Sequence, residues 1–228
     1  MIIQPTPNIH FHNNNSLRLD GINDHMQIDT VCGDVSVSVG TFSAWVKKEA
    51  TESNDLIMKF DADSSNHISV IYLNSTNKMR FSHKAGGTAK TFDVDFEYEG
   101  DNNWYHISQT WDTDADEFKG YINGVQVGET KSSLGTWSGT VDAADVGKNS
   151  VSDNSYWTGY IDQVSIFTSV VSASTLYNGG TPGNLNGMSN LVAWYQFNEG
   201  SGTSIADSSG TGNTGTLVNG AAFNTDTP

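Results

Sequence analysis

Apolar and polar residues alternate along most of this chain in short runs. In TFSAWVK, residues 41–47, the side chains of Phe42, Ala44 and Val46 would share one side of an extended strand. The run WYHISQTW, residues 104–111, alternates in the same way. A period of two residues is typical of a strand with one buried face. Clusters of Gly, Asn, Asp and Ser separate the runs, so the pattern predicts an all-β protein, a two-sheet antiparallel β-sandwich.

Two further runs are apolar at consecutive positions. HISVIYL, residues 67–73, and LVAWYQF, residues 191–197, would place apolar residues on both sides of a strand. Strands of this composition are covered on both faces, so we expect both near the middle of the sandwich. Between two other runs, Asn123-Gly124 is the pair that best tolerates the positive φ angles of a two-residue type I′ turn, which predicts a hairpin.

One segment has the end signals of a short helix. In residues 170–180, Ser172 is a suitable N-cap and Gly179 a suitable stop. The next segment, residues 178–190, has the composition of a linker, but a strong strand pattern follows it. We therefore expect it to cross back over the sandwich rather than to lead into a separate domain.

Length and composition support one domain. The chain has 228 residues, of which 36% are hydrophobic, enough to bury a sizeable core. We expect an N-terminal arm over residues 1–15 and a single sandwich over residues 16–228. Cys32 is the only cysteine, so an intramolecular disulfide and a CxxC site are excluded, and we expect a small packed side chain there.

The charge of the chain narrows the choice of partners. Eleven Lys and Arg against 26 Asp and Glu give a net charge of −15, which repels nucleic acid and anionic lipid surfaces. No apolar run approaches the ~20 residues of a membrane helix, so we expect no membrane insertion. The first residues lack the basic and apolar regions of a signal peptide, so a complete chain would be expected to fold in a cytoplasm.

Five segments, taken in order, resemble the successive strand motifs of the laminin-G-like, or concanavalin A-like, jelly-roll superfamily. They are LRLDGINDHMQI, FSAWVK, WYHISQTWD, GYINGVQVG and WTGYIDQVSIF. The resemblance covers residues ~16 to ~178. It implies a two-sheet antiparallel jelly roll of a kind used mostly to bind glycans or proteins.

The segment LVAWYQFNEGSGTSIADSSGTGNTGTLVNGAAF, residues 191–223, resembles the start of many such domains, yet here it comes last. Either residues 191–220 complete the same sandwich in permuted order, or they begin a truncated second copy. A truncated copy would expose a large apolar patch that includes Leu191 and Trp194. The permuted order is therefore the interpretation we favour.

Residues 177–200, followed by DSSGTGNTGT, also resemble the tail of laminin-G-like structural proteins of tailed phages, especially marine ones. This resemblance implies a non-catalytic virion structural, capsid-decoration or adhesion protein. Its expected partners are other virion proteins or copies of itself, as a homo-oligomer, and cell-surface glycans. The alternatives are an extracellular or cell-surface carbohydrate-binding module cut from a larger secreted protein, and a glycosidase.

A structural Ca²⁺ site is implied by the same family. Asp162 has the alternation parity of apolar neighbours, and a buried acid needs hydrogen-bond donors or a cation. In the family the matching Asp often binds calcium with a loop that looks like ADSSGTGN, which nominates Asp162, Asp207 and Asn213, with Asp20 as a further member. The alternative is that Asp207 and the serines make turn hydrogen bonds while a bulge turns Asp162 outward.

Two other groups of side chains are candidates for chemistry. Asp93, Asp95, Glu97 and Glu99 would share one side of a strand, as paired glycosidase carboxylates can, but a solvated outer face has the same pattern and is favoured. The histidines of HFH, residues 10–12, could bind a metal, and a solvated arm is again the favoured interpretation.

Four aromatic residues at strand ends or in loops are candidates for stacking on sugar rings, although most such rings belong to the core or to protein contacts. They are Trp104, Trp137, Tyr156 and Trp157. The sequence thus predicts ligand-binding loops at TWSG, residues 136–139, and NSYWTG, residues 154–159.

Overall fold

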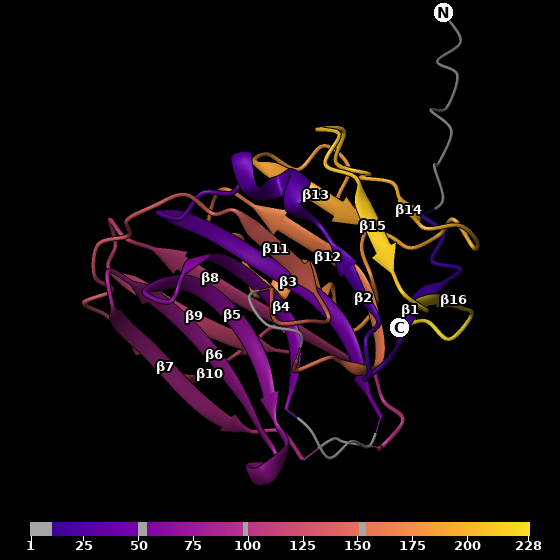
Figure 1. The fold of residues 1–228 in the computed structure, drawn as a ribbon, viewed down its shortest axis with the longest axis horizontal. Coiled ribbons are helices and arrows are strands. Elements are labelled where there is room, and N and C mark those ends of the chain that lie inside the picture. Colours follow the sequence, from indigo (N-terminus) through magenta and orange to yellow (C-terminus); the bar gives the residue numbers. More distant parts are fainter. Residues whose placement is uncertain (1–10, 50–53, 98–99, 151–153) are drawn as a thin grey trace, which may run out of the picture.

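The computed structural model describes residues 11–49, 54–97, 100–150 and 154–228. They form two eight-stranded sheets packed face to face (Figure 1), and neighbouring strands run antiparallel. The predicted all-β, two-sheet sandwich is confirmed. Because each strand alternates in composition, one face of each sheet is apolar and the two apolar faces meet.

Sheet A has the strand order β10-β9-β8-β3-β12-β1-β16, and β13 also pairs with β12. Its strands are β1 (Ser16–Asp20), β3 (Val39–Lys48), β8 (Tyr105–Asp112), β9 (Glu117–Ile122), β10 (Val125–Lys131), β12 (Thr158–Phe167), β13 (Leu191–Tyr195) and β16 (Ala222–Asn224).

Sheet B has the order β14-β15-β2-β11-β4-β5-β6-β7. Its strands are β2 (His25–Gln27), β4 (Asp55–Asp63), β5 (Asn66–Leu73), β6 (Lys78–Ala85), β7 (Thr88–Asp95), β11 (Ala143–Val146), β14 (Ser204–Ile205) and β15 (Gly215–Val218). Two short 3₁₀ turns, Asp29–Gly33 and Asn74–Thr76, lie between strands.

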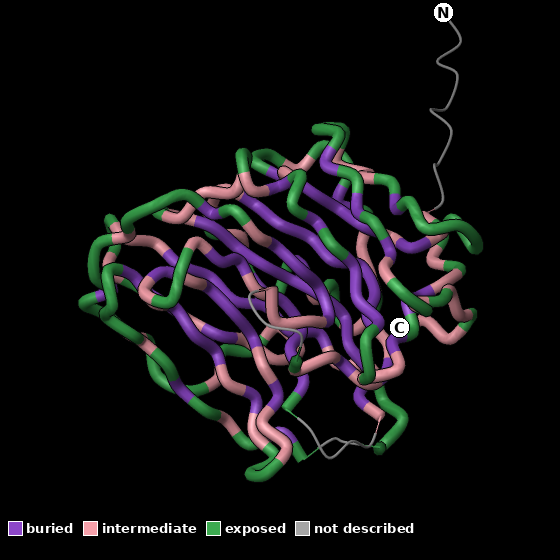
Figure 2. The backbone as a smooth tube through the Cα atoms, in the orientation of Figure 1, coloured by how far each residue is buried: buried purple, intermediate pink, exposed green. Residues whose placement is uncertain are grey.

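The core lies between the sheets, where the buried strands of Figure 2 face one another. Val146, Met58, Val70 and Phe81 pair side by side across four strands of sheet B and all point into this core. β5 lies between β4 and β6 inside sheet B, as predicted for residues 67–73. The predicted type I′ hairpin is also confirmed, because the φ angles of Asn123 and Gly124 are 51° and 76°.

The C-terminal strands belong to the same two sheets. β13 pairs with β12 in sheet A, β15 pairs with β2 in sheet B, and β16 pairs with β1 (Figure 1, yellow). Residues 191–224 therefore supply strands on both sides of one core. β13 is buried as expected, but it pairs with β12 alone among the described strands, so it does not lie in the middle of its sheet.

The outer face of sheet A is covered, which the alternation pattern of β3 and β8 did not predict. The helix α1 (Ala173–Tyr177) and the segment 178–190 pack over this face, through Leu176 and Leu185. β3 and β8 are therefore buried on both faces rather than half-buried. The predicted crossing of residues 178–190 is confirmed.

The predicted short helix is also present. α1 follows Ser172, whose hydroxyl bonds to the Ser174 hydroxyl and makes no capping bond to the backbone. The helix ends at Asn178, which takes the left-handed conformation with φ 48°, one residue before the predicted stop at Gly179. Asn is the residue after Gly that best tolerates this conformation, so the helix can end there.

Candidate functional site

Polar side chains form rows across the outer face of sheet B. One row runs through Gln27, Asp145, Lys59, Ser69 and Ser82, which pair side by side on five neighbouring strands. These residues alternate with the core residues of the same strands, so the period of two places all of them on the face away from sheet A. No helix lies over this face in the described part of the chain, in contrast to sheet A.

Several of these polar side chains are recessed. Asp145, Ser69 and Ser82 are buried, and the Lys59 ammonium forms an ion pair with the buried Asp61 carboxylate. Lys59 Nζ also donates to Asn149 Oδ1 at 3.2 Å. Buried polar groups need such partners, because desolvation without a hydrogen bond is unfavourable. Hydrogen bonds and ion pairs therefore hold the polar side chains of the outer face of sheet B in defined positions.

A cleft of about 530 Å³ opens where these rows reach β2, β11 and β15; we call it the sheet B cleft. Its lining includes Gln27, Asp145, Lys148, Tyr156 and Asn219. One half-buried aromatic ring, one ammonium group and several amides and carboxylates therefore surround one hollow. A volume of this size holds a small organic ligand such as one or two sugar rings.

Contacts within the sheet B cleft hold its side chains in place. The His25 ring lies 6.1 Å from the Tyr156 ring, centroid to centroid, and its Nε2 lies 3.9 Å from Asp145 Oδ1. His25 Nδ1 lies 3.1 Å from the carbonyl oxygen of Asn23. Asp29 accepts hydrogen bonds from the Ala144 N–H at 2.9 Å and from Gln27 Nε2 at 2.6 Å. The carboxylates of this cleft thus serve to position their neighbours.

The four predicted aromatic residues lie in different places. Tyr156 lines the sheet B cleft, while Trp137 is half-buried against the core beside His83. Trp104 directly precedes β8 of sheet A, and its indole donates to Asp226. Trp157 is fully buried between the sheets, so the prediction that it stacks on a ligand needs correction: it has no exposed ring face.

Asp207 acts as a hydrogen-bond acceptor that organises its own loop. One carboxylate oxygen accepts the N–H groups of Trp194 and Ser209, at 2.9 and 2.8 Å. The other accepts the hydroxyls of Ser209 and Thr211, at 2.8 Å each, and the N–H groups of Gly212 and Asn213, at 3.0 Å each. Partial burial opposes ionisation, but these donors hold the pKa of Asp207 below its ordinary value.

Two further predicted calcium ligands, Asn213 and Asp20, also make hydrogen bonds within the chain. Asn213 donates its amide to Asp34 at 2.8 Å and to the Val192 carbonyl at 2.9 Å. Asp20 accepts three backbone N–H groups in the turn that follows it, at residues 22–24. Asp20 therefore caps its own turn.

Asp162 lies on the outer face of sheet A. A bulge after it, with Gln163 at φ 47°, returns Val164 to the core and leaves Asp162 on the opposite face. Asp162 is nevertheless fully buried there, because Asn13 of the arm lies over it and donates Nδ2 at 2.8 Å. Burial raises the pKa of Asp162 well above its ordinary value.

The donor set does not fit a calcium site in this arrangement. Ca²⁺ takes six to eight oxygen ligands, whereas both oxygens of Asp207 already accept hydrogen bonds. Trp194 separates the two acids: its backbone N–H donates to Asp207, and its indole donates to Gln163, next to Asp162. Among the described residues, no group of three or more His, Cys, Asp or Glu is placed to hold a metal ion.

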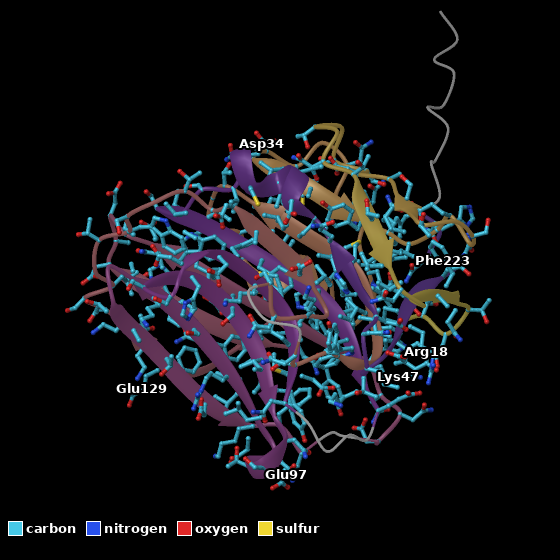
Figure 3. The ribbon with its side chains drawn as sticks, in the orientation of Figure 1. Arg18, Asp34, Lys47, Glu97, Glu129 and Phe223 are labelled. Carbon is cyan, nitrogen blue, oxygen red and sulfur yellow. The ribbon has the colours of Figure 1, made fainter. Side chains whose placement is uncertain are left out.

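The acidic strand has the favoured outer-face arrangement. Asp93 pairs with Arg80, at 2.7 Å, and Asp95 with Lys78, at 2.6 Å, across the exposed side of β6 and β7. Glu97 is exposed at the far end of the molecule from Asp34 (Figure 3), and Glu99 lies outside the described residues. Neither Asp93 nor Asp95 lines the sheet B cleft.

Cys32 and His12 are the remaining candidates within the described residues. Cys32 is half-buried, and its pKa is raised to about 11 by burial and the nearby acids Asp29, Asp142 and Asp145, so the thiol stays protonated. His12 is exposed, and His10 lies outside the described residues.

A second cleft, of about 490 Å³, lies on the sheet A side. Its floor is Trp194, on which Phe11 of the arm stacks with ring centroids 5.7 Å apart, and Asn14, Gln196 and Asn198 line it. Sequence reasoning did not find this cleft, or the roles of His25 and Lys148 in the other one. Each cleft combines distant segments, and no local pattern marks the residues that meet there.

The comparisons with known proteins agree with this architecture. The family model described as the concanavalin A-like lectin/glucanases superfamily, a laminin-G-type model, matches residues 20–176. The chain belongs to this superfamily. The predicted laminin-G-like, concanavalin A-like fold family is thereby confirmed, and the strands after residue 176 extend the sandwich beyond the matched segment.

Several solved structures are similar in fold at low sequence identity. A Bacteroides ovatus protein proposed to bind carbohydrate is 16% identical, with a TM-score of 0.67 over 96% of this chain and 62% of its own. The CBM40 of the Ruminococcus gnavus IT-sialidase, bound to α2,3 sialyllactose, is 15% identical, with a TM-score of 0.54 over 71% of this chain and 95% of its own. A Limulus polyphemus SAP-like pentraxin is 14% identical, with a TM-score of 0.53 over 72% and 81%.

The chain spans about three fifths of the Bacteroides ovatus protein, and a search of curated proteins finds no match. No helix within the described ranges is both long and apolar enough to cross a membrane.

Proposed function

We propose that the protein is a non-catalytic carbohydrate-binding protein and that the sheet B cleft holds the glycan. The observation that carries this proposal is the combination of one aromatic ring, Tyr156, with fixed amide, ammonium and carboxylate groups around a hollow of about 530 Å³. Sugars present apolar ring faces and dense hydroxyl groups, and this lining offers partners for both.

The geometry of the cleft favours binding over hydrolysis. A glycosidase needs two carboxyl groups that flank the scissile bond, one of them ready to donate a proton. Asp29 is instead committed to Gln27 and the Ala144 N–H, and Asp145 is beside His25. We expect no release of reducing ends from polysaccharides, and no difference in any trace activity between the wild type and Glu97→Gln. Loss of a measured activity in Glu97→Gln would revive the glycosidase alternative.

Similar folds support the same proposal. The Ruminococcus gnavus module is described in complex with sialyllactose, and the Bacteroides ovatus protein is proposed to bind carbohydrate. The fold is shared at 14–16% identity, so it provides a scaffold suited to sugars, while the ligand is set by the lining of this chain's own cleft.

The direct test is a glycan array with the full chain and two variants. Tyr156→Ala removes the half-buried tyrosine ring from the lining, and we expect it to abolish binding. Tyr121→Ala, at another half-buried tyrosine on sheet A, is the matched control and should retain binding. Equal binding by Tyr156→Ala and the wild type would remove the sheet B cleft from the proposal.

For the biological setting we propose a structural, decorating or adhesion component of a phage particle. The support is the resemblance of residues 177–200 and the following DSSGTGNTGT segment to tails of phage structural proteins. Other virion subunits or second copies of this chain would then be partners, and an extracellular carbohydrate-binding module is the alternative. Antibodies against the chain should label purified particles; labelling of host cell surfaces alone would favour the alternative.

A further inference from the structure

Aromatic and cationic side chains alternate in a row across the outer face of sheet A. Trp104, which directly precedes β8, is followed by Lys47, Tyr160 and Arg18 on β3, β12 and β1; we call these four residues the aromatic-cation row. Lys47 pairs in register with Tyr160, and Tyr160 with Arg18. Lys47 Nζ lies 4.7 Å from the centre of the Tyr160 ring and 6.0 Å from that of Trp104. Arg18 Cζ lies 5.9 Å from the Tyr160 ring.

A carboxylate of the same chain lies on this row. Asp226, which follows β16, pairs one oxygen with the Lys47 ammonium and accepts the Trp104 indole N–H with the other at 2.9 Å. Its backbone carbonyl accepts the Ser16 hydroxyl at 2.6 Å. Partial burial opposes ionisation, but the Lys47 and Trp104 hydrogen bonds hold the pKa of Asp226 below its ordinary value. Both carboxylate oxygens are thus recognised by separate donors.

The row has the features of a built anion site. The Lys47 side chain is only 4% exposed, whereas an ordinary surface lysine is solvated. Its ammonium also donates to Asn102 Oδ1 at 3.1 Å, which fixes its direction. A small cavity of about 140 Å³ adjoins it, lined by Lys47, Asn102 and Tyr160 among others. Arg18 pairs with Glu49 at 3.0 Å, and Glu49 also lines this cavity, so the anion-binding groups of the row are the Lys47 ammonium and the Trp104 indole N–H.

We propose that the aromatic-cation row is a binding site for a carboxylated sugar and that Asp226 occupies its carboxylate position from within the chain. A carboxylate fits this site because the Lys47 ammonium and the Trp104 indole N–H make charge-assisted hydrogen bonds to its two oxygens. The neighbouring Trp104 and Tyr160 rings, 6.2 Å apart, explain the sugar, because pyranose faces pack on aromatic rings.

The site is independent of the sheet B cleft and lies on the opposite sheet. Figure 3 labels Lys47 and Arg18 toward the edge where Figure 1 places β1, β16 and the C-terminal end, and Tyr160 of β12 pairs with both. An intramolecular carboxylate competes at a high effective concentration, so the apparent affinity for an external acid is lowered by the fraction of time the site is occupied. Removal of Asp226 should therefore strengthen binding.

The test is NMR titration of the full chain with glucuronate, with glucose as the uncharged counterpart. Asp226→Ala should bind glucuronate at least about tenfold more tightly than the wild type, because the competing carboxylate is gone. Glucose should bind neither protein at this site. Glu129→Ala, which removes an exposed acid on β10, is the matched control and should behave like the wild type.

Two further substitutions test whether the bound glucuronate lies on the aromatic-cation row. In the Asp226→Ala background, Trp104→Phe keeps a ring but removes the indole N–H, and Lys47→Met removes the ammonium; both should abolish the gain. If Lys47→Met fails to fold, Trp104→Phe still tests the site. Tyr156→Ala should leave this binding intact, so failure of the sheet B cleft and failure of this site are distinguishable.

Three outcomes would overturn the proposal. They are equal glucuronate affinity in the wild type and Asp226→Ala, binding that survives both Lys47→Met and Trp104→Phe, and binding of glucose at the same strength as glucuronate. Preference of Asp226→Ala for an acidic peptide such as tri-aspartate over glucuronate would also overturn the assignment to a sugar.

Discussion

The strands of both sheets alternate apolar and polar residues, yet the outer face of sheet A is covered by other segments and the outer face of sheet B is open. On sheet A, the arm, α1 and the segment 178–190 cover β3, β8 and β12, and polar residues such as Ser43 and His106 become interior. On sheet B, the polar rows remain open and end in the cleft. The same strand pattern therefore serves as a second core on one face and as a binding surface on the other.

The cover also buries a polar network on the outer face of sheet A. Asp162 is fully buried under Asn13, and the Trp194 indole donates to Gln163 at 2.9 Å beneath the crossing segment. These bonds connect the arm, β12 and β13. Removing a member of this network affects folding, whereas removing an exposed residue of the sheet B face affects mainly the surface.

The largest expected difference between the two faces is in stability. Trp194→Ala removes a ring that is 2% exposed and stacked on Phe11, so we expect the free energy of unfolding to fall by about 3–5 kcal/mol. Thr91→Ala, at an exposed position of sheet B, should change it by less than about 0.5 kcal/mol. Urea unfolding of both variants measures this contrast; similar losses would show that the two faces are equally structural.

The second prediction concerns pH. Burial lowers the pKa of His106 to about 3, while an unfolded histidine titrates near 6.5. The unfolded chain therefore binds more protons between these values, and stability falls as the pH drops from 6.5. By pH 4 the loss at this residue should be about 3 kcal/mol.

His106→Gln tests the predicted loss of stability at low pH. The substitution should flatten the dependence of the unfolding free energy on pH over the range 6.5 to 4. His67, half-buried on the open face, has a pKa lowered mainly by burial, and His67→Gln is the comparison variant. We expect the smaller change there. An equal effect of the two substitutions would contradict the distinction between the faces.

The third prediction concerns the Asp207 loop, which holds the backbone of Trp194 in the cover. Asp207→Ala leaves six donors without their acceptor, and we expect a loss of about 2 kcal/mol. Because both oxygens are occupied, the melting temperature should be the same in EDTA and in millimolar calcium. A rise in calcium that Asp207→Ala abolishes would instead establish the calcium site nominated from the sequence.

The fourth prediction concerns the cleft, where a small change in stability is expected. Tyr156 is half-buried at the rim of sheet B, so Tyr156→Ala should lower the free energy of unfolding by less than about 1 kcal/mol. The same substitution should abolish glycan binding. A calorimetric melt and the array together test this, and a large loss of stability would mean that the ring is a core residue.

Much of the candidate site was beyond sequence reasoning. Tyr156 was found because it lies in a loop between strands, but Trp157 next to it has the same sequence signal and is buried in the core. The acids that resemble calcium ligands carry hydrogen bonds from their own loops. A residue type in a loop indicates what it can do, and only its neighbours decide which of these functions it performs.

Period-two alternation, the Asn123-Gly124 pair and the order of strand motifs were enough to determine the sandwich, because strand formation, turn geometry and burial of one face are local properties. The ion-pair partners of Lys47 and Lys48, in contrast, do not follow from the local sequence. They are adjacent on β3, yet Lys47 pairs with Asp226 on the outer face, while Lys48 forms a fully buried ion pair with Asp55 at 3.0 Å. Which partner each lysine meets depends on contacts between distant segments, so only the tertiary structure decided it.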